Sequence, residues 1–310
     1  MLSLEQSSPI KMIPADLGSE NVEIPVADLK GERAGKTLLV TAGMDGDEYA
    51  GIGAAYELIR RYNGQNFAGR LIIVPIVNRL GFKEECSRNP LDGKYPKAIV
   101  RGQVKGSASE RLIYWLDSNY VRNADFWCDL HGGSLTERLY PFIWLYRSGV
   151  FSLDAQALKL AYQFPADTIV FQSVSSESRA GYWARHNCFS ALFESGGRGE
   201  VRTEDIERQI LWLECVMKEM GMIEETASLA VKVQAMIYNK IEYLGAPFDG
   251  LWRPKIRSDR RVASAEILGE CFHFDGTSGR NILTAQAGRI LWQKETLSMR
   301  RGDILAAVAY

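Results

Sequence analysis

Apolar and polar positions along the first 220 residues follow patterns typical of strands and helices in turn. Residues 37–42 (TLLVTA) form a short apolar run that ends in glycine, as a buried strand does. Apolar residues then recur at helical spacing from Asp47 to Tyr62, and Asn63-Gly64 closes that pattern. Because parallel strands need crossover connections, strands separated by helices predict a mostly parallel mixed sheet with helices on both faces.

The same reasoning extends along the chain. It predicts further strands at residues 71–77, 126–130, 168–171 and 191–193, and helices at residues 107–120 and 203–220. Pro75 lies inside the run 71–77 and indicates a bulge or an edge position, because proline has no N–H to donate to a strand ladder.

The pattern changes after about residue 228. From Val231 to Ile237 apolar residues alternate with more polar ones, which is closer to a period of two. Turn signals such as Phe248-Asp249-Gly250 then recur at short intervals. We therefore expect an α/β domain over residues 1–227 and a small C-terminal all-β barrel or sandwich over residues 228–310.

Composition narrows the classes of function. The chain has 310 residues and a formal net charge of −1, so no broad basic field is present to bind nucleic acid or an anionic membrane. No run approaches about 18 uninterrupted apolar residues, and the N-terminus lacks the pattern of a secretory signal. The five cysteines are scattered without a CxxC pair, which is typical of reduced thiols in the cytosol. We expect a cytoplasmic protein whose partner is a small molecule held in a pocket.

Four residues that can carry chemistry follow apolar runs and stand beside glycines. Asp45 and Glu48 follow the first run in TAGMDGDE, His131 lies in DLHGG, and Glu194 lies in FESGG. The carboxyl ends of parallel strands share one edge of a sheet, where open α/β folds bind ligands. We therefore expect these four side chains to converge.

The chemistry of the set suits a metal site. Asp45, Glu48 and His131 supply three ligands and leave a fourth position open for water, as catalytic zinc requires. Glu194 is then the expected general base on the metal-bound water. Each residue also has an ordinary structural interpretation: capping of a helix for the DxxE pair, a hydrogen-bonded core position for the histidine, and bonds to turn amides for Glu194.

At these residues the chain resembles the succinylglutamate desuccinylase/aspartoacylase family, whose members are relatives of the zinc carboxypeptidases. The resemblance covers nearly the whole chain and rests on TLLVTAGMDGDEYAG, NPLDGK, DFWCDLHGG and FESGG. It implies a carboxypeptidase-like catalytic domain and an amidohydrolase that removes the acyl group of a small N-acylated amino acid. It also implies one Zn²⁺ per chain, with Glu48 and His131 as ligands and Glu194 as the base.

Two departures from the family pattern affect this expectation. Asp45 stands where the family has its first histidine ligand, and two carboxylates with one imidazole favour harder ions such as Mn²⁺ beside zinc. Lys97-Ala98 replaces an Asn-Arg pair that resembles a clamp for the substrate carboxylate, where Lys97 can supply a point charge. Arg88 lies near the position of another anion-binding arginine. We expect Arg88 and Lys97 to bind substrate.

Two functional hypotheses therefore stay open. The first is a metal-dependent deacylase, and the second is a non-catalytic relative that binds a small anion or a partner in a degenerate pocket. The presence of Glu48, His131 and Glu194 favours the first, because a site without activity has no chemical need for a base. We also expect a homo-oligomer, because closed symmetric assemblies are common among soluble enzymes.

Overall fold

The largest feature of the protein is a nine-stranded mixed sheet, seen in a computed structural model that describes residues 8–224 and 233–310. Its strands lie in the order β1-β2-β4-β3-β5-β9-β7-β8-β10. Five neighbouring pairs are parallel and three are antiparallel, so the predicted fold class is confirmed. The bounds are β1 Ile10–Asp16, β2 Asn21–Lys30, β3 Arg33–Ala42, β4 Ala68–Val74, β5 Phe126–His131, β7 Phe142–Arg147, β8 Thr168–Ser173, β9 Phe189–Glu194 and β10 Met236–Tyr238.

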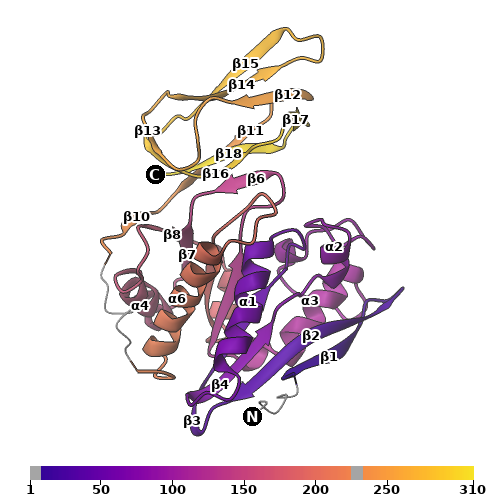
Figure 1. Cartoon of the computed structure of the whole chain (residues 1–310), viewed down its shortest axis with the longest axis vertical. Helices are drawn as coiled ribbons and strands as arrows, with labels where there is room; N and C mark the ends of the chain where they lie inside the picture. The colour runs from indigo at the N-terminus through magenta and orange to yellow at the C-terminus, as the bar shows by residue number, and fades with distance from the viewer. Residues whose placement is uncertain (1–7, 225–232) are drawn as a thin grey trace, which may run out of the picture.

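Helices cover both faces of this sheet (Figure 1). Apolar side chains of α1, α4 and α6 pack against one face, and those of α3 and α5 pack against the other. The helices are α1 Tyr49–Tyr62, α2 Arg79–Lys83, α3 Ala108–Asn119, α4 Phe151–Ala161, α5 Arg179–Ala184 and α6 Thr203–Glu219, with 3₁₀ turns η1 Pro96–Ala98 and η2 Val121–Asn123. Within the described ranges no helix is both long and apolar enough to span a bilayer.

The proline in the second apolar run has a simpler explanation than the one predicted. β4 ends at Val74, and it lies between β2 and β3 in the interior of the sheet. Pro75 therefore lies beyond the strand, and the prediction of a bulge or an edge strand is wrong. The apolar run continues past the strand because Ile76 and Val77 are buried in the following loop.

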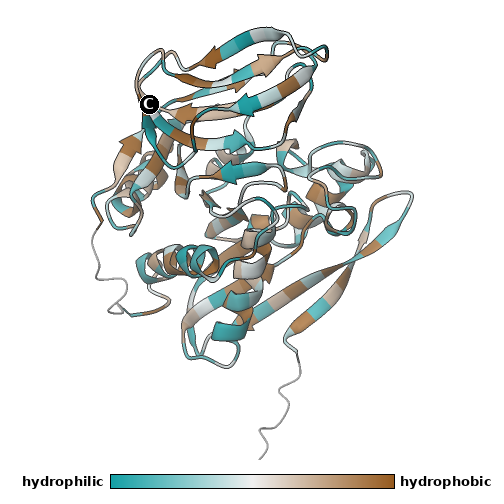
Figure 2. Cartoon of the chain, turned by 45° about the horizontal axis from the view of Figure 1, so that its top comes forward, coloured by the Kyte–Doolittle hydropathy of each residue, from teal (hydrophilic) through white to brown (hydrophobic). Residues whose placement is uncertain are grey.

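The hairpin of β1 and β2, the strand β7 and the helix α4 are not among the predicted elements. The hairpin extends the sheet at one side and mixes hydrophobic and hydrophilic residues along its length (Figure 2). β7 is inserted antiparallel to β9 and parallel to β8. This insertion places the start of β7 beside the end of β9, at the edge where the candidate residues lie.

The C-terminal part forms two small antiparallel sheets, as its turn-rich pattern predicts. One sheet has the order β11-β18-β16-β13 and the other β15-β14-β12-β17. Figure 1 shows both sheets on the same side of the large sheet, above the carboxyl ends of its central strands. Their strands are β11 Ile241–Gly245, β12 Gly250–Pro254, β13 Arg261–Val262, β14 Ile267–Phe272, β15 Ser278–Leu283, β16 Gly288–Lys294, β17 Ser298–Met299 and β18 Ile304–Ala309.

The predicted boundary between residues 227 and 228 lies outside the described residues. Two strands cross this division: β10 pairs with β8 of the large sheet, and β6 (Glu137–Leu139) pairs with β16 of a C-terminal sheet. The separate C-terminal module therefore stays a prediction. Of the period-two segment predicted from Val231, the first residues also lie outside the described ranges, and a strand begins only at Met236.

Candidate active site

Three neighbouring strands of the large sheet bring the candidate residues to one edge. β3, β5 and β9 lie side by side and run parallel, so their carboxyl ends meet. Asp45 and Glu48 follow β3, His131 ends β5 and Glu194 ends β9. His131 and Glu194 are also register partners in adjacent strands. The predicted convergence of the four residues is therefore present in the structure.

The turn from β3 into α1 depends on glycine. Gly43 has φ +61°, in the left-handed region that favours glycine. At Gly46 a Cβ atom would lie 2.1 Å from the backbone nitrogen of Phe82, so the loop can approach α2 this closely only without a side chain. This tight turn places Asp45 and Glu48 beside His131, with Glu48 on the wall of the cleft.

Glu48 does not act as a helix cap. It stands at the N-cap position of α1, but its side chain makes no capping hydrogen bond. Its Oε2 instead accepts from the backbone N–H of Gly132 at 3.2 Å and lies 2.7 Å from Nδ1 of His131. The capping interpretation of this carboxylate is therefore wrong, and the side chain is directed into the site.

Asp45, Glu48 and His131 can present one ligand atom each within 4.8 Å of one another. All three are buried, and Asp45 has no exposed surface. Nδ1 of His131 lies 3.7 Å from Oδ2 of Asp45. Oδ1 of Asp45 is buried without a hydrogen-bond partner, which is costly for a carboxylate unless a cation is close.

The far side of the His131 ring is held by a chain of hydrogen bonds that the sequence analysis missed. Nε2 lies 3.1 Å from Oδ2 of Asp129. Asp129 in turn accepts from the Thr41 hydroxyl at 2.6 Å, and that hydroxyl accepts from the Trp127 indole N–H at 2.8 Å. A signal was present, because residues two apart in a strand point to the same face, as Asp129 and His131 do. Such partners fix the orientation of a ligating imidazole.

The carboxylates of the site perturb one another. Burial, reinforced by repulsion from Glu48, raises the pKa of Asp45 to about 7. Burial and the nearby Glu48 likewise raise the pKa of Glu194 well above its ordinary value. Burial alone would lower the pKa of His131, but the Asp129 and Glu48 carboxylates outweigh it and raise that pKa well above 6.5. The raised pKa values of Asp45 and Glu194 indicate that the carboxylates of this cluster repel one another despite the nearby Lys97 and His131.

The residues line a cleft of about 740 Å³ between the edge of the large sheet and the C-terminal sheets. Glu48, His131 and Glu194 form part of its wall, and Tyr243, Trp292 and Lys294 contribute from the C-terminal part. A smaller recess of about 160 Å³ adjoins His131 and is lined by Tyr146 and Arg179.

Both residues expected to bind substrate also line the large cleft. The Arg88 guanidinium lies 4.2 Å from the centre of the Tyr95 ring, and its Nη1 donates to the carbonyl oxygen of Gly93 at 2.7 Å. Nζ of Lys97 forms an ion pair with Oδ2 of Asp45 and lies 3.9 Å from Oε1 of Glu48. The partner of Lys97 in this structure is therefore an expected metal ligand.

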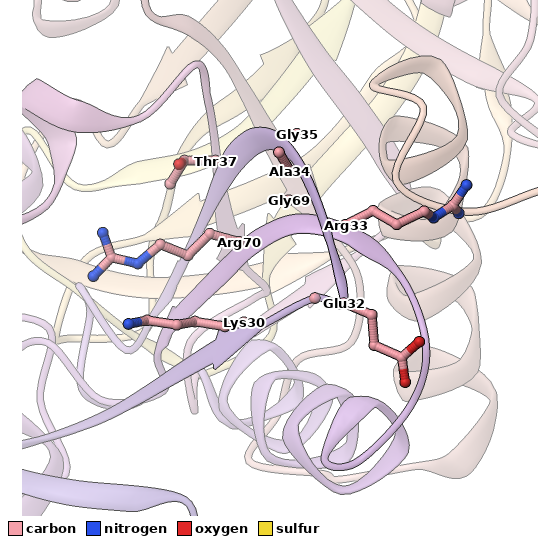
Figure 3. A pocket seen from close by; sticks show the side chains of 9 residues that line it. Lys30, Glu32, Arg33, Ala34, Gly35, Thr37, Gly69 and Arg70 are labelled. Carbon is pink, nitrogen blue, oxygen red and sulfur yellow. The ribbon is translucent and has the colours of Figure 1, made fainter.

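A second depression, of about 490 Å³, lies at the opposite end of the sheet around Gly31 and Gly69. Its charged side chains do not converge: Lys30 and Arg70 extend to one side, and Glu32 and Arg33 extend to the other (Figure 3). This depression therefore has no convergent set of polar groups like the cluster at the carboxyl ends of the strands.

Comparison with known proteins shows the family to which this chain belongs. A sequence profile described as the succinylglutamate desuccinylase/aspartoacylase catalytic domain matches residues 34–220. The chain belongs to this family. The resemblance seen in the sequence motifs is thus confirmed, and the matched region contains all four candidate residues.

Known proteins match this chain over most of their length. N-alpha-acetyl-L-2,4-diaminobutyric acid deacetylase of Halomonas elongata is 25% identical over 297 residues, which cover 93% of this chain and 86% of that protein. The succinylglutamate desuccinylase/aspartoacylase structure from Rhodobacter sphaeroides is 25% identical with a TM-score of 0.84, covering 100% of this chain and 97% of that one. The product-bound ectoine utilization protein EutE of Ruegeria pomeroyi shares the fold, with 21% identity, a TM-score of 0.84, and coverage of 98% and 99%.

Proposed function

We propose that this family member is a metal-dependent hydrolase that cleaves the amide bond of a small N-acylated amino acid. The observation that carries the proposal is the convergence of Asp45, Glu48, His131 and Glu194 at the ends of three adjacent strands, the last three on the wall of one cleft. Membership of the family and the similarity to the Halomonas deacetylase support a deacylase.

The donor set fits a divalent cation. Asp45, Glu48 and His131 offer two carboxylates and one imidazole within reach of one point, and Oδ1 of Asp45 is buried without a partner. Two carboxylate ligands suit Zn²⁺ and also harder ions such as Mn²⁺. Such an ion would act as a Lewis acid on the amide carbonyl and on water.

The chain's own residues supply the proton transfers. Glu194 takes a proton from water as the water oxygen attacks the carbonyl carbon, and donates that proton to the departing amine nitrogen as the C–N bond breaks. Burial raises the pKa of Glu194, so its ionised form is a stronger base than an exposed carboxylate. Asp129 holds the His131 ring in position through Nε2.

The cleft suits an amino-acid-like substrate. Its lining includes the Arg88 guanidinium, and also Lys294 and Asp303, which pair with each other at 2.7 Å. The Arg88 guanidinium matches the free carboxylate of an N-acylated amino acid, whose nitrogen is an uncharged amide. We propose Arg88 and Lys97 as groups that bind the substrate carboxylate.

The five cysteines are all unpaired, in accord with the proposed cytoplasmic location. The homo-oligomer stays a prediction that light scattering would test.

Metal analysis combined with a substrate panel tests the proposal. Protein purified without chelator is expected to hold close to one divalent ion per chain and to hydrolyse some members of a panel of N-acetyl and N-succinyl amino acids. Amine release, followed with a fluorogenic amine reagent, should stop after treatment with a chelator and return with Zn²⁺ or Mn²⁺. Protein that takes up no divalent ion and hydrolyses nothing on the panel would contradict it.

The second candidate is a non-catalytic relative that binds a small anion. The contact of Lys97 with Asp45 favours this alternative, because a lysine ammonium can occupy the carboxylates in place of a metal ion. Calorimetry with the same panel separates the two. Binding of an intact N-acyl amino acid without turnover, in the presence of Zn²⁺ or Mn²⁺, would favour the anion-binding protein.

A further inference from the structure

Lys97 and the proposed metal ion bind the same carboxylates, those of Asp45 and Glu48. Nζ of Lys97 forms an ion pair with Oδ2 of Asp45 and lies 3.9 Å from Oε1 of Glu48. The same two side chains, with His131, make up the ligand cluster. The ammonium group therefore lies against the carboxylate groups that a divalent ion would need.

A divalent ion and an ammonium group held by the same two carboxylates repel each other strongly in a partly desolvated site. We propose that Lys97 is a built-in competitor for the metal site: its ammonium neutralises Asp45 and Glu48 when no ion is bound, and a divalent ion binds by displacing it. This inference rests on the proposed function, because it takes Asp45 and Glu48 as ligands.

Burial decides which partner moves. Asp45 has no exposed surface and sits in the tight turn before α1, whereas the Lys97 side chain is 47% exposed and faces the cleft. Lys97 also lies on η1, a 3₁₀ turn of three residues, and has a flexible four-carbon stem. Withdrawal of the ammonium into the cleft therefore needs no rearrangement of the sheet edge.

The proposal joins the two departures from the family pattern into one feature. Asp45 and Lys97 look independent in the sequence, yet their side chains are in direct contact. A histidine at position 45 would leave the ammonium only the Glu48 carboxylate, at 3.9 Å, as a negative partner. A neutral residue at position 97 would leave the Asp45 and Glu48 carboxylates to repel each other. Each residue thus accounts for the other.

Metal affinity measures the competition directly. Affinity for Mn²⁺ and for Zn²⁺ would be determined by calorimetry and chelator competition on the wild-type protein, Lys97→Met and Lys94→Met. Lys94 is a matched control: its side chain is 46% exposed in the same loop, but it pairs with Glu110 outside the cleft. The apparent affinity for the metal ion is proportional to the fraction of molecules whose site is free of the ammonium group. We therefore expect Lys97→Met to bind the ion at least about tenfold more tightly than the wild type, and Lys94→Met to match the wild type.

A second measurement needs no variant at position 97. Amine acylation of the wild-type protein, read by peptide mass spectrometry, should modify Lys97 faster when Mn²⁺ is present, while Lys94 reacts at an unchanged rate. Equal or weaker metal binding by Lys97→Met, or a Lys97 acylation rate that Mn²⁺ leaves unchanged, overturns the competition but leaves the proposed metal site standing. If neither the wild type nor Lys97→Met takes up any ion, the proposed metal-dependent function is also contradicted.

Discussion

His131 and Glu194 are register partners at the ends of two adjacent parallel strands. This pairing fixes the proposed base beside the proposed ligand through the backbone hydrogen bonds of β5 and β9. The separation of the two side chains therefore depends on the sheet itself, and not on a loop. The paired ends of β5 and β9 thus form a rigid support for the site.

Replacing Glu194 with glutamine should remove turnover and leave metal binding intact. The amide keeps the size of the side chain but cannot take a proton from water, and general acid–base catalysis typically contributes about 10²–10⁴-fold. Hydrolysis of the best substrate on the panel should fall by a factor in that range. Glu177→Gln is the control, because Glu177 is exposed and is not among the residues that line the cleft. Activity that survives in Glu194→Gln would show that another residue is the base.

Changing Asp45 to histidine should shift the metal preference of the site toward zinc. The variant restores two imidazoles and one carboxylate, a ligand set that zinc favours over harder ions, and it removes the carboxylate partner of Lys97. We expect the ratio of Zn²⁺ to Mn²⁺ affinity to rise by about tenfold. Competition dialysis followed by metal analysis gives this ratio. An unchanged ratio would show that residue 45 is not a ligand.

Gly51 of α1 controls how closely that helix approaches β5. A Cβ atom there would lie 2.6 Å from the carbonyl oxygen of Leu130, so Gly51→Ala must push the helix away from the strand. We expect a loss of about 1–3 kcal/mol in the free energy of unfolding and lower activity, because Glu48 precedes this helix and His131 ends this strand.

Gly53→Ala is the matched control on the same helix. Its Cβ would meet only the side-chain ends of Ile206 and Val201, each at 3.1 Å. Small movements of those side chains relieve the contact, and alanine is favoured over glycine in a helix by about 1 kcal/mol. Urea unfolding should show that Gly53→Ala is at least as stable as the wild type, whereas Gly51→Ala is less stable. Equal losses in the two variants would remove the packing argument.

The ion pair of Arg179 with Asp117 joins α5 to α3 beneath the small recess. Nη2 of Arg179 lies 2.5 Å from Oδ1 of Asp117, and the two side chains are only 10% and 11% exposed. Arg179→Met should cost about 3–5 kcal/mol, because it leaves a buried carboxylate without a partner. The double variant with Asp117→Leu should recover most of that loss in urea unfolding. A double variant no more stable than the single one would contradict this reasoning.

Glu57 should make the stability of α1 depend on pH. Hydrogen bonds from Arg60 and Arg61 lower the pKa of Glu57 to about 2 in the folded protein, from an ordinary value of 4.5. A pKa that is lower in the folded state than in the unfolded state stabilises the fold at pH values above the unfolded-state pKa. This contribution is lost as the pH falls from about 4.5 toward 2. The stability difference between the wild type and Glu57→Gln should therefore be largest at neutral pH and shrink in acid. Urea unfolding from pH 7 to pH 3.5 checks it, and a difference that grows in acid would contradict it.

The sequence by itself determined the elements whose local pattern is strong. β3 and β5 are short apolar runs bounded by glycine or polar residues. α3 begins with the predicted serine cap, a capping box between Ser107 and Glu110, and α6 is followed by Gly221 at φ +73°. Because the carboxyl ends of parallel strands share one edge, these patterns also predicted that Asp45 and His131 would meet.

Only the tertiary structure decided the remaining features. Nothing local in Phe142–Arg147 specifies that β7 lies between β9 and β8, antiparallel to β9 and parallel to β8, because strand order depends on pairing between distant segments. The contact between Lys97 and Asp45 is likewise absent from any local pattern, since it arises only when the loop carrying η1 folds across the end of β3. Local sequence sets backbone preference and periodicity, whereas the charge that a buried carboxylate meets is set by whichever segment the fold brings to it.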